Sequence, residues 1–169
     1  GYKFRVQSAA RVVEDIVYWN NRGMMKFDIN DDEFSFMRER VFAICDGILE
    51  KGLKVELRLF NGIRVSDVTP ELVAKMKSAG FSAITYAIES GSPKVIKSSR
   101  KAITIEQALN AITWTKEAGI ETTVNFIIGH PDETYEDALM TLELMKTVPG
   151  DKLNFNNAVV YPGTELHTW

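Results

Sequence analysis

The sequence predicts an α/β domain built on a parallel β-sheet, and two patterns lead to this prediction. First, segments with helical hydrophobic spacing alternate with short strand-like runs along the chain, an order that calls for parallel strands joined by right-handed crossovers. Second, glycine followed by an apolar residue recurs about every 30 to 40 residues, at Gly23, Gly52, Gly80 and Gly119. Glycine just after a helix closes it in the left-handed conformation, so each of these positions predicts a helix end followed by a strand.

Local signals place the individual elements. Five residues that commonly cap helices precede segments with helical periodicity: Ser8, Ser35, Thr69, Thr104 and Thr134. Strands are expected between these helices, roughly at residues 25–29, 54–60, 83–88, 122–128 and 153–160. The third and fourth of these strands are apolar on both alternating faces, which predicts that both of their faces are covered.

Composition bounds the class of protein. The 169 residues, 45% of them hydrophobic, predict a single domain over residues 1–169. The net charge of −3 does not indicate the excess of basic residues that binding to nucleic acid or an anionic membrane would need. No apolar run is long enough to cross a membrane. We therefore expect a cytoplasmic protein that acts on a small molecule and has neither nucleic acid nor membrane as a partner. The single cysteine, Cys45, excludes an internal disulfide, and its place on an apolar helical stripe predicts a buried thiol.

Polar residues follow the predicted strands, and the carboxyl ends of parallel strands meet at one edge of a sheet. Asp31 and Asp32 follow the first strand, and Glu89 ends the third. A glutamate at that place can accept hydrogen bonds from the hydroxyls of a ribose, whereas the alternative is a salt bridge to a neighbouring lysine or arginine. A second alternative is a Mg²⁺ site formed by the three carboxylates, or a plain helix cap at one of the aspartates.

An ordered series of short motifs resembles a known family. The motifs are Asp31-Asp32-x-Phe34, Asn61-Gly62-Ile63-Arg64, Ile88-Glu89-Ser90-Gly91-Ser92, Lys101, Ile127-Ile128-Gly129-x-Pro131-x-Glu133-Thr134 and Tyr161-Pro162-Gly163-Thr164-Glu165-Leu166. Together they resemble the core domain of radical S-adenosylmethionine (SAM) enzymes. The resemblance is greatest to the branch with an N-terminal cobalamin-binding domain, which includes anaerobic Mg-protoporphyrin monomethyl ester cyclases and cobalamin-dependent methylases.

The resemblance implies a partial TIM-like (βα)6 barrel of parallel strands, with the first strand missing and about five βα units present. It also implies SAM bound across the strand ends. By position in the motifs, the amino group of SAM would be contacted by Asp31, Asp32 and Glu33, the ribose by Glu89 and Ser90, and the carboxylate by Lys101. The adenine would be surrounded by Ile127, Gly129, Tyr161, Pro162 and Gly163.

The chain departs from the family in one respect: it lacks the CxxxCxxC loop that ligates the [4Fe-4S] cluster. We therefore expect the cluster ligands to lie outside this chain and the chain itself to be inactive. The whole protein would cleave SAM reductively at the cluster, to start an oxidative cyclisation or a methyl transfer, with cobalamin as an optional cofactor in a separate domain. The alternative functions are a Mg²⁺-dependent α/β barrel enzyme using Asp31, Asp32 and Glu89, and a noncatalytic nucleotide-binding domain.

The expected absence of a first strand has a further implication. It would leave an open sheet edge beside residues 25–29, covered in part by residues 2–6, and an open edge invites pairing with another chain. We therefore expect self-association through this edge.

Overall fold

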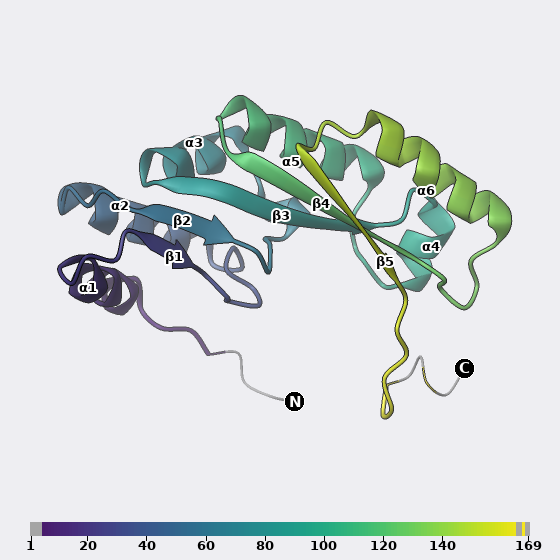
Figure 1. Ribbon diagram of the computed structural model, residues 1–169, viewed down its shortest axis with the longest axis horizontal. Coiled ribbons are helices and arrows are strands. Elements are labelled where there is room, and N and C mark those ends of the chain that lie inside the picture. The colour runs from purple at the N-terminus through teal and green to yellow at the C-terminus, as the bar shows by residue number, and fades with distance from the viewer. Residues whose placement is uncertain (1–4, 165–166, 168–169) are drawn as a thin grey trace.

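The computed structural model describes residues 5–164 and 167, and within them five strands form a single parallel sheet (Figure 1). The strands follow one another in chain order across the sheet. They are β1 (Lys26–Asp28), β2 (Glu56–Leu59), β3 (Phe81–Glu89), β4 (Glu121–Ile128) and β5 (Lys152–Asn157). All four pairings between neighbours are parallel, which confirms the predicted fold class.

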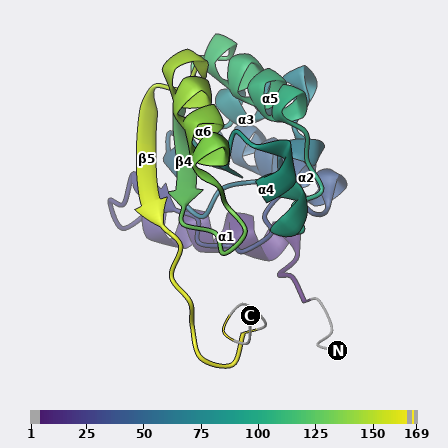
Figure 2. The same cartoon turned by 90° about the vertical axis from the view of Figure 1, so that its right-hand side faces the viewer.

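The crossovers between the strands are helical. The helices are α1 (Ala9–Asn20), α2 (Arg38–Glu50), a short 3-10 helix η1 (Val65–Asp67), α3 (Pro70–Ser78), α4 (Pro93–Ser98), α5 (Ile105–Glu117) and α6 (Tyr135–Thr147). Helices α2, α3, α5 and α6 lie along one face of the curved sheet (Figures 1 and 2). None of the helices described is long and apolar enough to cross a bilayer.

The hydrophobic core fills the space between this helical layer and the sheet. Buried side chains from the helix-facing side of the strands meet buried side chains of the helices: Leu57, Leu59, Ile84, Ile88, Val124 and Phe126 against Ile44, Ile48, Leu72, Met76, Ala108 and Ile112. Tyr86 is fully buried among them and satisfies its hydroxyl by a 2.6 Å hydrogen bond with the Thr115 hydroxyl. Cys45 is buried in the same core, and burial raises the pKa of its thiol to about 12.

The opposite face of the sheet carries polar side chains. A hollow of about 570 Å³ lies over it, lined by residues such as Arg58, Thr123 and Asn125. The prediction that both faces are covered is therefore wrong for β4, whereas on β3 Ala83 and Thr85 of this face are buried as well as the residues of the helix-facing side. On β4 buried positions alternate with half-buried ones, because Thr123 and Asn125 belong to the face that no helix covers.

The polar groups of this open face are paired with one another. Lys26 and Glu56 form a 2.8 Å ion pair, Arg58 and Asp28 one of 2.7 Å, and Lys152 and Glu121 one of 2.7 Å. Between the last two strands, the Asn154 amide donates to the Asn125 side chain at 3.0 Å. These cross-strand pairs fix the register of polar residues that have no core to pack against.

Four of the five predicted helix starts are confirmed by side-chain caps, at Ser8, Thr69, Thr104 and Thr134. The fifth, Ser35, was wrong: α2 begins three residues later at Arg38. The Ser35 hydroxyl instead donates to Asp67 at 2.8 Å and accepts from the Arg64 backbone N–H at 3.1 Å. Ser35 therefore joins the loop after β1 to η1.

Two elements were not predicted at all, namely α4 and η1. The last predicted strand was too long, since β5 ends at Asn157. The sheet edges are β1 and β5, so the edge expected beside residues 25–29 is present, and self-association through it stays a prediction. Of the segment expected to cover that edge, residues 2–4 lie outside the described residues.

The glycines that close α2 and α3 offer a test of how tightly the layers are fitted. Gly52 and Gly80 both have a positive φ angle, +62° and +100° respectively. A Cβ atom added at Gly52 would meet nothing within 4 Å, whereas one added at Gly80 would collide with the backbone carbonyl of Val55. We expect Gly52→Ala to lower the free energy of unfolding by about 1–2 kcal/mol through left-handed strain alone. Gly80→Ala should cost roughly 1–3 kcal/mol more, because β2 must also shift.

Urea denaturation of both variants measures the difference. Equal losses of stability would show that the carbonyl of Val55 gives way without cost.

Candidate functional site

A cavity of about 360 Å³ lies at the carboxyl edge of the sheet. Its walls are the acidic turn after β1 (Asp32 and Glu33), residues 61–66 after β2, Ala87 on β3, and residues 100–103 between α4 and α5. The crossovers bring these segments together because every parallel strand ends at the same edge. The cavity therefore contains three of the residues that the resemblance assigns to SAM contacts, namely Asp32, Glu33 and Lys101.

The acidic turn supplies an anion that is only partly paired. The Oε2 atom of Glu33 is buried and accepts no hydrogen bond; it forms a 3.6 Å ion pair with Arg64 Nε, while the Glu33 side chain as a whole is 43% exposed. Asp31 does not line the cavity; its Oδ2 is 3.3 Å from both terminal guanidinium nitrogens of Arg40. A buried carboxylate oxygen without a donor is costly, so the turn is suited to a cationic group in the cavity.

Glu89 has an unusual backbone at the end of β3. The register with β4 shifts between Ala87 and Glu89. The φ angle of Glu89 is +73°, in the left-handed region that residues other than glycine rarely adopt. Such a conformation costs on the order of 1–3 kcal/mol and persists where surrounding contacts enforce it, often at functional sites. The bulge re-aims the Glu89 side chain relative to the regular alternation of the strand.

The Glu89 carboxylate forms an ion pair with Lys101, whose Nζ donates to Oε1 at 2.6 Å and to the Ala87 carbonyl at 2.5 Å. The salt bridge named as the alternative for Glu89 is thus present. Among the described residues, the second oxygen, Oε2, has no hydrogen-bond partner. Glu89 itself does not line the cavity, but it is held from one side by Lys101, which does, and it keeps an acceptor for a further donor.

Ser90 takes no part in the cavity. It is fully buried, and its hydroxyl is 3.0 Å from that of Thr141 and accepts from the Ser92 N–H at 3.0 Å. Its hydroxyl therefore has a structural role, and its expected ligand contact stays a prediction.

Ile127 and Gly129 end β4 at the same sheet edge but do not line the cavity. The Gly129 N–H donates at 2.5 Å to Glu133, whose other carboxylate oxygen is buried without a partner, as is Nε2 of His130. This turn was predicted from its motif, whereas its two unsatisfied atoms depend on packing that the sequence does not reveal.

The expectation that Tyr161, Pro162 and Gly163 surround the adenine stays a prediction, and these residues lie away from the cavity. All three are exposed on the extended segment after β5, which leads away from the sheet in both views and does not line the cavity (Figures 1 and 2). The physical reason is that β5 stops at Asn157, so no ladder hydrogen bonds hold these residues at the sheet edge.

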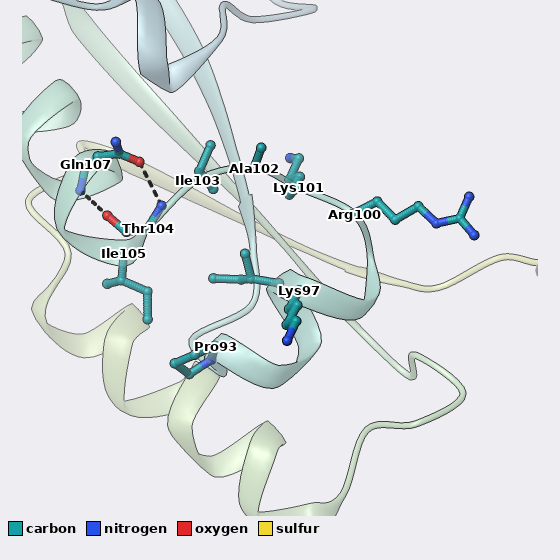
Figure 3. A pocket seen from close by; sticks show the side chains of 10 residues that line it. Pro93, Lys97, Arg100, Lys101, Ala102, Ile103, Thr104, Ile105 and Gln107 are labelled. Carbon is teal, nitrogen blue, oxygen red and sulfur yellow. Dashed lines mark hydrogen bonds between the residues drawn. The ribbon is translucent and has the colours of Figure 1, made fainter.

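A larger hollow of about 820 Å³ lies between α4 and the start of α5 (Figure 3). It is mainly apolar, with Ile103, Ile105 and Pro93 among its walls, and it shares residues 100–103 with the cavity. Its polar residues Thr104 and Gln107 are already bonded to each other, as the dashed lines in Figure 3 show. We place the candidate site in the smaller cavity, because unsatisfied and charged groups converge there.

Asp31, Asp32 and Glu89 are not gathered into a metal site in the part of the chain that the structure describes. Within the described residues no three histidine, cysteine, aspartate or glutamate side chains lie close enough together to hold a metal ion. The Mg²⁺ alternative built on Asp31, Asp32 and Glu89 therefore has no structural support.

A sequence profile of the Radical SAM superfamily matches residues 21–145. The chain therefore belongs to the radical SAM superfamily, whose members use SAM and a [4Fe-4S] cluster. It is 30% identical, over 98% of its length, to an uncharacterized methyltransferase of Pyrococcus horikoshii. It is 26% identical, over 96% of its length, to the anaerobic magnesium-protoporphyrin IX monomethyl ester cyclase of Cereibacter sphaeroides. These relatives confirm the predicted resemblance to the cyclase and methylase branch.

The fold is also that of a solved enzyme. The radical SAM methyltransferase TsrM of Kitasatospora setae, solved with cobalamin and a [4Fe-4S] cluster bound, superposes with a TM-score of 0.85 over 95% of this chain, at 16% identity. This likeness supports the reading of the sheet as part of a TIM-like barrel. The chain spans 36% and 27% of the two relatives and 30% of the TsrM chain.

The described residues fit one of the two cofactors of the superfamily. For SAM, the cavity has a volume within the range of small-molecule sites, a Glu33 oxygen that is paired with Arg64 but accepts no hydrogen bond and could bind an ammonium group, and Lys101 and Arg64 as cations. For the cluster, the chain offers one cysteine, which is buried. Cluster binding by thiolates needs several exposed ligands, so the residues of this chain do not fit it.

We expect that the 169-residue chain, incubated anaerobically with iron and sulfide and then desalted, retains no stoichiometric iron. Its single thiol is desolvated, and the raised pKa of Cys45 keeps it protonated at neutral pH. Iron and acid-labile sulfide assays measure the result, with Cys45→Ala as the matched control. Stable iron in both proteins would mean that oxygen ligands hold it, and it would revive a carboxylate metal site.

Proposed function

We propose that this chain is the SAM-binding part of a radical SAM enzyme of the cyclase or methyltransferase type. The observation that supports this most strongly is the strained Glu89, which ends β3 beside the cavity with one carboxylate oxygen still available. A non-glycine residue in the left-handed region is retained where its exact aim is needed, and a ribose offers the two hydroxyl donors that a carboxylate accepts.

The residues in and beside the cavity would then each have a role. Glu89, which adjoins the cavity through Lys101, would accept from a ribose hydroxyl at Oε2, while Asp32 and Glu33, which line the cavity, would bind the ammonium group at the other end of the ligand. Lys101 holds Glu89 in place and adds positive charge near the ligand carboxylate. When bound, SAM supplies a sulfonium whose one-electron reduction starts radical chemistry.

The remaining parts of the activity belong to the whole protein. The cluster ligands and cobalamin are proposed for segments outside this chain. The cobalamin proposal is supported by TsrM, and the chain alone should be inactive. The substrate is proposed to be a small molecule, as the tryptophan substrate is for TsrM. Either an oxidative cyclisation or a methyl transfer is compatible with the two relatives.

The test is Glu89→Gln in the whole protein, with SAM affinity measured by calorimetry without reductant and thermal stability measured alongside. Glutamine keeps the shape and one acceptor but loses the charge. A charge-assisted hydrogen bond contributes roughly 1.5–3 kcal/mol, so SAM affinity should fall about tenfold or more. The matched control is Glu121→Gln, because Glu121 also pairs with a lysine, Lys152 at 2.7 Å, but at the opposite end of the sheet. It should leave SAM affinity unchanged.

The opposite pattern would contradict the proposal. If Glu89 serves only to hold Lys101 and the loops, Glu89→Gln will lower the melting temperature and leave SAM affinity at the level of the control.

A further inference from the structure

The two loops that follow β3 and β4 are bonded to the first turns of α6, and Asp137 lies at the centre of this arrangement. Its carboxylate belongs to a side chain that is largely buried. Oδ1 accepts from the Ser92 hydroxyl at 2.6 Å, and Oδ2 accepts from Lys94 Nζ at 2.8 Å and from the Thr134 N–H at 2.9 Å. Lys94 and Ser92 hold the pKa of this carboxyl well below its usual range, so it is ionised at neutral pH.

One turn later, Thr141 binds the same loop. Its hydroxyl oxygen accepts from the Gly91 N–H at 2.9 Å and is 3.0 Å from the Ser90 hydroxyl. Gly91 is buried against the α6 backbone so closely that a Cβ there would collide with the Met140 carbonyl. Each of the three residues that follow Glu89 is thus hydrogen-bonded to a side chain of α6.

The loop after β4 is held by the same group of residues. Lys94 also donates to the Asp132 carbonyl at 2.6 Å, and Thr134 closes a capping box with Asp137. A capping box alone would need only Thr134 and Asp137. The bonds to Ser92 and Lys94 reach 45 and 43 residues back along the chain, and they join the loop after β3 to the loop after β4.

We propose that Asp137 is a positioning residue for SAM binding, which acts by holding the segment after Glu89 so that Glu89 keeps its left-handed backbone and its aim. This inference rests on the proposed function. Its physical basis is that a strained residue relaxes unless its neighbours over-determine it. The residues that follow Glu89 in the sequence are Ser90, Gly91 and Ser92. Thr141 binds the first two, and Asp137 binds the third.

The experiment combines Asp137→Asn with Glu89→Gln in the whole protein, with SAM affinity measured by calorimetry without reductant. Asparagine keeps the shape and an acceptor but loses the charge that binds Lys94. We expect Asp137→Asn alone to weaken SAM binding roughly three- to tenfold, within the range of couplings measured between neighbouring residues. In the Glu89→Gln background the same change should have little further effect, because both substitutions act on one contact.

The matched control is Asp151→Asn at the other end of β4. Asp151 Oδ2 accepts from the Thr122 N–H and hydroxyl, both at 2.9 Å, and Oδ1 pairs with Lys116 at 3.0 Å, so it resembles Asp137 in its bonding. A purely structural role for Asp137 predicts that both variants lose stability and neither loses SAM affinity. Should Asp137→Asn fail to fold, Lys94→Met tests the same link from the more exposed partner.

The outcomes separate this inference from the proposed function. If Glu89→Gln itself leaves SAM affinity unchanged, the proposed function fails. The positioning role of Asp137 is overturned, while the proposed function stands, in either of two cases. In the first, Glu89→Gln weakens SAM binding but neither Asp137→Asn nor Lys94→Met does. In the second, the effects of Asp137→Asn or Lys94→Met on SAM affinity simply add to that of Glu89→Gln.

Discussion

Parallel pairing is the constraint on which the rest of this structure depends. A parallel strand cannot be reached by a tight turn, so the chain must cross back along the sheet after every strand, here mainly through helices. Right-handed crossovers place those helices on one face, where the core forms. The same constraint brings the strand-to-helix loops to one edge, where the segments after β1 and β2 meet residues 100–103 and form the cavity.

Much of this could be predicted from the sequence, because its signals are local. Glycine after a helix and an N-cap residue before one act through bonds within a few residues, so the order and type of most elements were correct. Ser35 shows the limit of this reasoning. Its propensity to cap a helix is real, but its hydroxyl is used by Asp67, which lies 32 residues further along the chain.

The site was predicted less completely, for a related reason. The bulge before Glu89 shifts the strand by one residue, and an apolar residue at position 88 fits either register, so no pattern marks it. The sequence around Asp137 identifies it only as the third residue of a helix capped by Thr134. No nearby residue in the sequence indicates that Ser92 and Lys94 are its partners. The expectations for Tyr161, Pro162 and Gly163 rested on resemblance alone, and the described structure does not place them at the cavity.

The balanced charges on the open face of the sheet affect how a molecule would approach the hollow above it. Three cations and three anions on or beside this face are matched in ion pairs of 2.7–2.8 Å, so their fields largely cancel beyond a few ångströms. A molecule that approaches this face is neither steered nor repelled by a net field, and its rate of arrival should depend little on ionic strength. Discrimination on this face is therefore left to short-range hydrogen bonding after arrival, for which the uncharged polar residues of the hollow, Asn125, Asn154 and Thr123 among them, are suited.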